Sequence, residues 1–201
     1  MRARGPARRP TALDEVRRAW GEFVGPETTA PQTAGILGVA LLGGVLAPLV
    51  VRLRGGGPTD QAVASAVALD LWGGALANNT LACARWYERP GQGDAEHLRF
   101  AAAHVHPAVV AWLDRAERRR VPPWVWAGAH YTYLLAATAA IRRWRRHRAP
   151  LGVALTLGGV ALDVALGPSR RAPWFAGVYY PKLLLGHAAT ARWSDEALRS
   201  G

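Results

Sequence analysis

Long apolar runs alternate with short, charged connectors along most of this chain. A helix needs roughly 20 residues to cross a hydrocarbon core, and most of the runs approach that length. The runs cover residues 34–51, 62–84, 99–114, 123–141, 150–167 and 172–190. This pattern predicts an all-α fold, a polytopic transmembrane helix bundle with about six spans.

The third run is the weakest of the six. Only Phe100 to Leu113 is free of charged residues, which is short for a span. The run also contains Pro107, which lacks an amide hydrogen and disturbs a helix from within. We therefore expect this segment to be tilted, kinked or re-entrant.

The segment before the first run has a different pattern. Residues 1–10 are basic and rich in proline, so we expect them to be unstructured. From Thr11 onward, apolar residues such as Leu13, Val16 and Trp20 recur at helical spacing, and Thr11 with Asp14 matches a capping pattern. This predicts an amphipathic helix that either lies in the membrane interface or packs against the bundle.

Basic residues gather in the connectors and not on one face of a soluble domain. The chain has 25 Lys and Arg against 14 Asp and Glu, for a formal net charge of +11. Arginine arrays at 118–120 and 142–146 adjoin the ends of apolar runs, where guanidinium groups contact lipid phosphates. We therefore expect a bilayer with anionic headgroups as the partner, and no nucleic acid.

The same charges predict an orientation. With six spans and a cytoplasmic N-terminus, 16 basic residues fall on the cytoplasmic side and 8 outside, as the positive-inside rule requires. The prediction is a multi-pass protein of the cell membrane, the inner membrane in a bacterium, with both termini cytoplasmic. It has a basic N-terminal segment at 1–30, a helical bundle at 31–191 and a short tail at 192–201. The single cysteine, Cys83, excludes a disulfide framework.

Several ionisable groups lie inside the apolar runs, where they are costly unless paired or hydrated and therefore suggest function. Asp70 shares a helical face with Gly73, Gly74 and Ala77, small residues that let another helix approach closely. Two interpretations remain open. Asp70 either faces a polar interior cavity or is an interhelical hydrogen-bond partner in a tight helix interface.

Histidines and one lysine extend this candidate site. His104 and His106 are two residues apart, so on a continuous helix they point to nearly opposite faces unless Pro107 distorts the turn. Lys182 follows a proline in mid-run, and we expect it to pair with Asp70 or Asp163. The predicted polar site comprises Asp70, Asn78, Thr80, His104, His106, His130, Asp163 and Lys182.

The pattern D-x-x-G-G-x-x-x-N-x-T, carried by Asp70, Gly73, Gly74, Asn78 and Thr80, resembles one in small bacterial integral membrane proteins of uncharacterised function. The resemblance covers about a tenth of the chain. It implies membrane residence and a shared polar site.

The combination of a membrane Asp with His residues from other helices also resembles zinc-dependent intramembrane hydrolases of the alkaline ceramidase and progestin/adiponectin-receptor type. That resemblance implies a zinc site made by Asp70, His104 or His106, and His130, with a metal-bound water as nucleophile. Those proteins have seven spans and a late paired-histidine motif, whereas His187 is isolated here.

No motif of the established soluble enzymes is present in the sequence. We therefore expect a membrane protein without enzymatic activity and without a cofactor. It would be a small-solute or proton-coupled carrier, or a subunit of a membrane complex, and a homo-oligomer is one form it could take. The alternatives are the metal-assisted lipid hydrolase and a bundle in which the polar groups only hold helices together.

Overall fold

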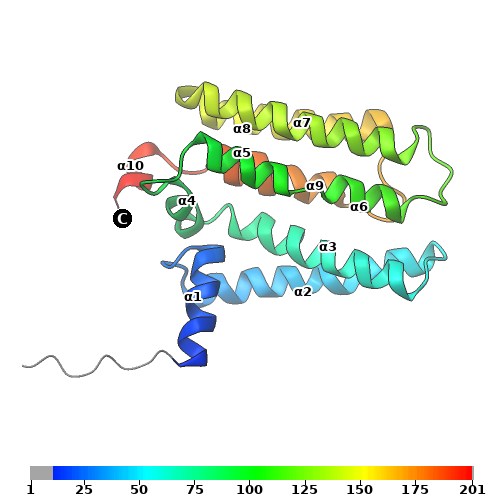
Figure 1. Cartoon of the computed structure of the whole chain (residues 1–201), viewed down its shortest axis with the longest axis horizontal. Helices are drawn as coiled ribbons and strands as arrows, with labels where there is room; N and C mark the ends of the chain where they lie inside the picture. Colours follow the sequence, from blue (N-terminus) through cyan, green and yellow to red (C-terminus); the bar gives the residue numbers. More distant parts are fainter. Residues whose placement is uncertain (1–10, 201) are drawn as a thin grey trace, which may run out of the picture.

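The computed structural model describes residues 11–200, and within that range the protein is helical with no β-strand (Figure 1). This confirms the all-α class. The basic segment 1–10, expected to be unstructured, lies outside the described residues. The elements are α1 (Ala12–Val24), α2 (Ala30–Leu53), α3 (Pro58–Ala77), α4 (Leu81–Glu88), α5 (Asp94–Ala103), α6 (His106–Leu113), α7 (Pro123–Arg143), the 3₁₀ turn η1 (Arg145–His147), α8 (Arg148–Leu166), α9 (Phe175–Tyr180), the π-helix η2 (Pro181–Ala188) and α10 (Asp195–Arg199).

Six helical rods lie side by side along the long axis of the molecule (Figure 1). They are α2, α3, the α5–α6 pair, α7, η1 with α8, and the α9–η2 pair, which correspond in order to the six apolar runs. At one end, here called the α4 end, α4 contacts both α1 and α10. At the other, here called the Asp60 end, lie the connectors 54–57, 114–122 and 167–174 (Figure 1).

The predicted N-terminal helix is present as α1, which crosses the bundle axis (Figure 1). Its capping box forms as expected, since the Thr11 side chain accepts from the Asp14 amide and the Asp14 carboxylate accepts from the Thr11 amide. Leu13 and Val16 point outward, and Trp20 donates a hydrogen bond to Thr33. The helix therefore contacts the bundle and still presents apolar side chains to its surroundings.

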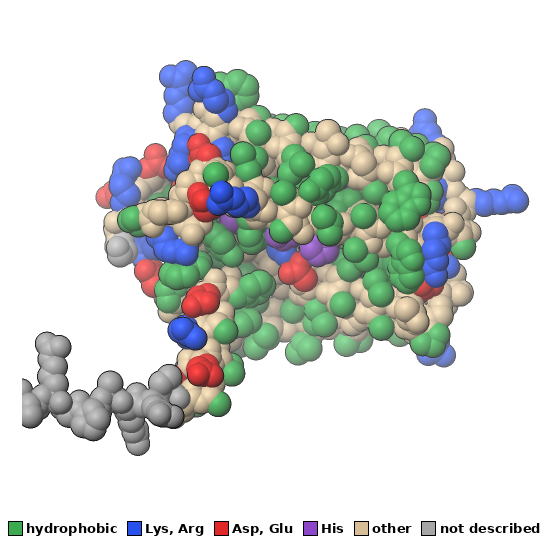
Figure 2. Space-filling view, in the orientation of Figure 1, with side chains coloured by type: hydrophobic (Ala, Val, Ile, Leu, Met, Phe, Trp, Pro, Cys, Tyr) green, Lys and Arg blue, Asp and Glu red, His purple; other side chains and the backbone are tan. Residues whose placement is uncertain are grey.

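Two helical segments are long and apolar enough to cross a membrane, Ala30–Leu53 and Arg145–Leu166. Most of the residues in each segment are not buried by the protein, and large side chains such as Leu41, Val45 and Leu157 are exposed. On the face shown in Figure 2, hydrophobic side chains are spread along the middle of the body, and most charged ones lie at its two ends. Among the described helices only these two meet both criteria, so six spans remain a prediction.

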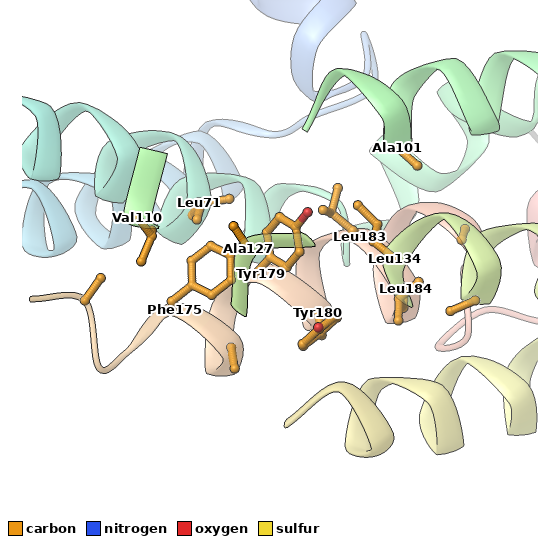
Figure 3. Close-up of a cluster of buried hydrophobic side chains, with 14 of the residues drawn as sticks. Leu71, Ala101, Val110, Ala127, Leu134, Phe175, Tyr179, Tyr180, Leu183 and Leu184 are labelled. Carbon is orange, nitrogen blue, oxygen red and sulfur yellow. The ribbon is translucent and has the colours of Figure 1, made fainter. Parts of the chain in front are cut away.

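The α9–η2 rod forms the centre of the core. It contacts α3, α7 and α8, and its Phe175, Tyr179 and Leu184 are fully buried against residues of those helices (Figure 3). The Tyr180 ring lies directly over Gly159 of α8, where a Cβ atom would come within 2.5 Å of it. Glycine at position 159 is therefore what lets α8 approach this rod so closely.

Ion pairs fasten the connectors at the Asp60 end. The Asp60 carboxylate accepts from Arg171 at 2.7 Å and from Arg115 at 2.9 Å, and Arg171 also binds Glu117 at 2.9 Å. Burial by itself would raise the pKa of Asp60, but the hydrogen bonds and charges of the two arginines outweigh it and hold that pKa below its ordinary value. Asp60 thus joins the starts of α3 and α9 to the end of α6.

Replacing Asp60 by Asn should destabilise the fold by about 3 kcal/mol at neutral pH, because Arg171 then stays buried with one partner fewer. The contribution of a carboxylate with a lowered pKa is present above its unfolded value of about 3.9 and is lost as the pH falls through the folded value. The thermal midpoints of wild type and D60N should therefore begin to converge below about pH 4 and should meet only below the lowered pKa of Asp60. A constant gap down to strongly acidic pH, or an equal loss in the exposed control E196Q, would contradict this account.

Candidate functional site

Three charged or titratable side chains from three different elements meet midway along the bundle. The Asp70 carboxylate of α3 accepts a hydrogen bond of 2.6 Å from the Lys182 ammonium of η2 and lies 3.1 Å from Nε2 of His106 on α6. Asp70 is about 15 Å along the α3 axis from Asp60, and therefore far from the charged connectors. We call these three residues the Asp70 site. Of the two carboxylates expected as partners of Lys182, Asp70 and Asp163, the structure pairs it with Asp70.

The Asp70 site is closed on one side and open on the other. Only 2% of the Lys182 side chain is exposed, against 35% for Asp70 and 20% for His106. Figure 2 shows acidic and histidine side chains together in a hollow midway along this face, bordered by hydrophobic side chains. The cluster therefore opens through the side of the bundle and not at either end.

Gly74 makes room for the lysine. A Cβ atom at position 74 would lie 2.4 Å from Cε and 2.8 Å from Nζ of Lys182, so the lysine side chain runs across the bare backbone of α3 to reach Asp70. Gly73 faces α2 instead, where its Cβ would meet that of Ala40 at 2.9 Å, and Ala77 is buried near the α1–α2 junction. The small residues predicted to share one face therefore serve two interfaces.

The third rod is interrupted beside this site, as its length and proline suggested. The helix α5 stops at Ala103, and the backbone turns at His104 (φ −85°, ψ 63°) before α6 begins at His106 with Pro107 behind it. The turn brings the rings of His104 and His106 to 5.4 Å between centroids. The two rings were expected to point to opposite faces only on a continuous helix; the helix breaks just before Pro107, so the exception allowed for a distorted turn applies.

The sixth rod is also irregular at this point, because it changes from α-helix to π-helix at Pro181. The side chain of Asn78 donates to the Lys182 carbonyl at 3.1 Å, and that of Asn79 donates to the Pro181 carbonyl at 3.0 Å. These two amides satisfy carbonyls that the altered turn presents to α3. Asn78 was predicted at the site, whereas Asn79 was missed although it stands next to Asn78 in the same polar run.

Thr80 has a different role from the one predicted. Its hydroxyl accepts from the Cys83 amide and donates to the Ala77 carbonyl, so it caps α4 after α3 has ended. The run 62–84 is consequently two helices with a turn at Asn78 to Thr80, and not one continuous span. Threonine is a preferred residue at the position before the first turn of a helix, so the sequence does carry a signal for this cap at Thr80.

His130 and Asp163 form a second cluster, separate in its contacts from the Asp70 site. Nδ1 of His130 lies 2.6 Å from the Tyr180 hydroxyl, and its Nε2 lies 3.4 Å from Asp163 without hydrogen-bond geometry. The Trp126 indole donates to Asp163 at 3.1 Å. The structure thus brings His130 close to Asp163 but gives neither residue a contact with Asp70, so the predicted polar site is divided in two.

The suggested zinc ligands are distributed over these different contacts. His104 approaches the Phe100 carbonyl at 2.6 Å through Nδ1, His130 faces Tyr180, and Asp70 faces Lys182 and His106. Over residues 11–200, no three His, Cys, Asp or Glu side chains are grouped closely enough to hold a metal ion. The ammonium on Asp70 also disfavours a second cation at the same carboxylate.

Comparison with known proteins returned no relative of this chain. No family model, no curated protein and no solved structure matches it. Its function must therefore be inferred from the site itself.

Replacing Gly74 by Ala should push the Lys182 side chain off Asp70 and cost about 1–3 kcal/mol of stability. The cost should largely disappear in a K182A background, where nothing crosses position 74, so a double-mutant cycle on thermal midpoints measures the effect. Gly38→Ala is the matched control, because a Cβ there meets nothing within 4 Å. Equal costs in the wild-type and K182A backgrounds would contradict the assigned contact.

Proposed function

We propose that this protein is a multi-pass membrane protein and a proton-coupled carrier that binds a small anionic solute at the Asp70 site. One observation carries the proposal. An ion pair with a neighbouring histidine lies midway along an apolar-surfaced bundle, at the place where two helical rods are interrupted. Interrupted helices beside a midplane charge are the usual construction of a carrier binding site.

The distribution of apolar and charged surface supports membrane residence. Large side chains such as Leu41, Leu46 and Leu49 are exposed along α2, while arginines cluster beyond the helix ends. Exposed leucines of this density are unfavourable in water and favourable in lipid. The crossing helix α1, with its outward Leu13 and Val16, suits a position in the interface at the α4 end.

The ion pair of Asp70 and Lys182 provides a way to couple the binding of a proton to the binding of an anion. When Asp70 is ionised it occupies the Lys182 ammonium; when it takes a proton, the ammonium loses its counter-charge and can bind an anion such as a carboxylate. A proton on Asp70 and an anion on Lys182 therefore favour each other's binding, which is the linkage that a proton-coupled carrier requires. His106, 3.1 Å from the same carboxylate, is placed to deliver or remove the proton.

Two other interpretations receive less support. A purely structural hydrogen bond between helices does not need a carboxylate that is 35% exposed, because burial would strengthen such a bond. A metal-assisted hydrolase needs cation ligands at Asp70, where a lysine ammonium already sits at 2.6 Å.

The topology can be tested with reporter fusions. A reporter active only in the cytoplasm, fused after residue 200, should report the same side as one fused before Thr11, and one inserted at Gly55 or Gly57 should report the opposite side. Gly55 and Gly57 are suitable because a Cβ there meets nothing within 4 Å, so an insertion disturbs little packing. Fusions to α10 and to the 54–57 connector that report one common side would exclude the proposed six spans.

Coupled transport can be tested in proteoliposomes containing a trapped pH dye, with lactate or succinate as the external probe. Wild-type protein should acidify the lumen faster than protein-free vesicles, and D70N should reduce the excess rate at least about tenfold because the exchangeable proton is gone. Thr138→Val, which alters a buried hydroxyl of α7 that has no partner in the described chain, is the control for general perturbation. Wild-type vesicles that acidify no faster than empty ones across a panel of small anions would reject the proposal.

A further inference from the structure

Between the Asp70 site and the α4 end, four histidines lie within an otherwise aromatic and apolar interior. His106 and His104 come from the interrupted third rod, His187 from η2 and His97 from the start of α5. Successive rings are joined by short centroid distances, 5.4 Å from His106 to His104, 4.4 Å from His104 to Phe100, 3.8 Å from Phe100 to His187 and 4.5 Å from His187 to His97. We call the four histidines the histidine row.

His187 is the unusual member of the row. It is almost fully buried, and neither ring nitrogen has a hydrogen-bond partner among the described residues. A neutral imidazole carries one N–H donor and one acceptor nitrogen, so burying both without partners costs free energy. A phenylalanine would fill the same aromatic stack, with Phe100 at 3.8 Å and Tyr87 at 4.6 Å, without that cost. Packing alone therefore does not account for a histidine here.

The row connects two polar places. At its inner end His106 contacts Asp70. At its outer end Nε2 of His97 lies 3.1 Å from the Tyr87 carbonyl and 3.6 Å from Glu88. The Glu88 carboxylate also binds Arg142 and the half-exposed Arg145. His97 also has a buried Nδ1 with no partner in the described chain.

The π-helix places His187 in this line. A π-helix bonds each residue to the fifth one before it, as between the Ala189 amide and the Leu184 carbonyl. Residues five apart, such as Lys182 and His187, then fall near the same side, whereas in an α-helix they diverge. The change of helix type at Pro181 therefore points both side chains into the same part of the interior.

We propose that the histidine row is a proton relay, with His187 as its central member, that connects the Asp70 site to Glu88 at the α4 end. No direct hydrogen bond joins successive histidines of the row, so the relay requires water molecules between them. Through one water, a proton from His97 binds one ring nitrogen of neutral His187; through a second, the proton on the opposite nitrogen passes toward His104, and the His187 ring returns to its first tautomer. One proton moves per cycle and no electrons are exchanged. The inference rests on the proposed carrier function, because it supplies the route by which the Asp70 site is protonated.

The charged and titratable groups around His187 come from several elements. They are Lys182 on η2, His97 on α5, His104 just after α5, Arg142 on α7 and Tyr87 on α4. None of these is a carboxylate, so no negative charge among them fixes a proton on the ring. These surroundings suit a residue that passes protons on.

The test uses ¹⁵N-histidine-labelled protein in lipid nanodiscs and measures by NMR how fast the His106 ring proton exchanges with water. In His187→Phe, which keeps the aromatic stack, this exchange should slow at least about tenfold, while the thermal midpoint is unchanged or higher. His97→Phe, which interrupts the row one step earlier, should slow it similarly. Thr138→Val, on a buried hydroxyl away from the row, should leave it at the wild-type rate.

A folded H187F or H97F protein whose His106 exchanges at the wild-type rate would overturn the relay. Should H187F fail to fold, H97F decides the matter through the same measurement. The experiment needs no transport, so its outcome is independent of the vesicle assay. If wild-type protein does not acidify vesicles but His106 exchange slows in H187F and H97F, the carrier is rejected and the relay is retained. If wild-type protein acidifies vesicles but His106 exchange is unchanged in both variants, the relay is rejected and the carrier is retained.

Discussion

The ion pair between Lys182 and Asp70 is the constraint to which the middle of this structure is fitted. An ammonium buried to 2% exposure is unfavourable without an opposite charge, so Lys182 must reach a carboxylate within the bundle. It reaches one only because position 74 of α3 has no side chain. The close contact of α3 with η2 and the glycine between them are thus both consequences of placing that charge in the interior.

The interruptions of the third and sixth rods follow from the same requirement. A straight third rod would turn His104 and His106 apart, and a regular sixth rod would turn His187 away from the side that carries Lys182. Each irregularity exposes backbone carbonyls, and the protein satisfies them with Asn78, Asn79 and Tyr179. Polar side chains therefore stabilise the departures from regular helix that bring the titratable groups together.

The sequence predicted the parts of the fold that depend on local pattern. Apolar run length located all six rods, the capping pattern at Thr11 located α1, and Pro107 marked the break in the third rod. It did not predict that Thr80 ends α3 by capping a separate helix, since a polar residue in an apolar run suits a buried site equally well. Helix period alone also could not show that the glycine face divides between α2 and Lys182, because that depends on where two distant helices pack.

Most of what the sequence left undecided about the candidate site is which side chains from distant segments pair with each other. Lys182 had two possible carboxylate partners, and the choice of Asp70 leaves Asp163 to Trp126 and His130. Tyr180 belongs to that second cluster because its hydroxyl contacts His130. From the sequence alone, a tyrosine in an apolar run is typical of the hydrophobic core and does not indicate such a contact. One charge assignment thus divides the polar interior in two: a side-opening cluster around Asp70, and an enclosed one in which Asp163 and His130 are held by Trp126 and Tyr180. Only the first is partly exposed, so the same residue types form an accessible cluster in one place and a buried one in the other, according to which segments pack around them.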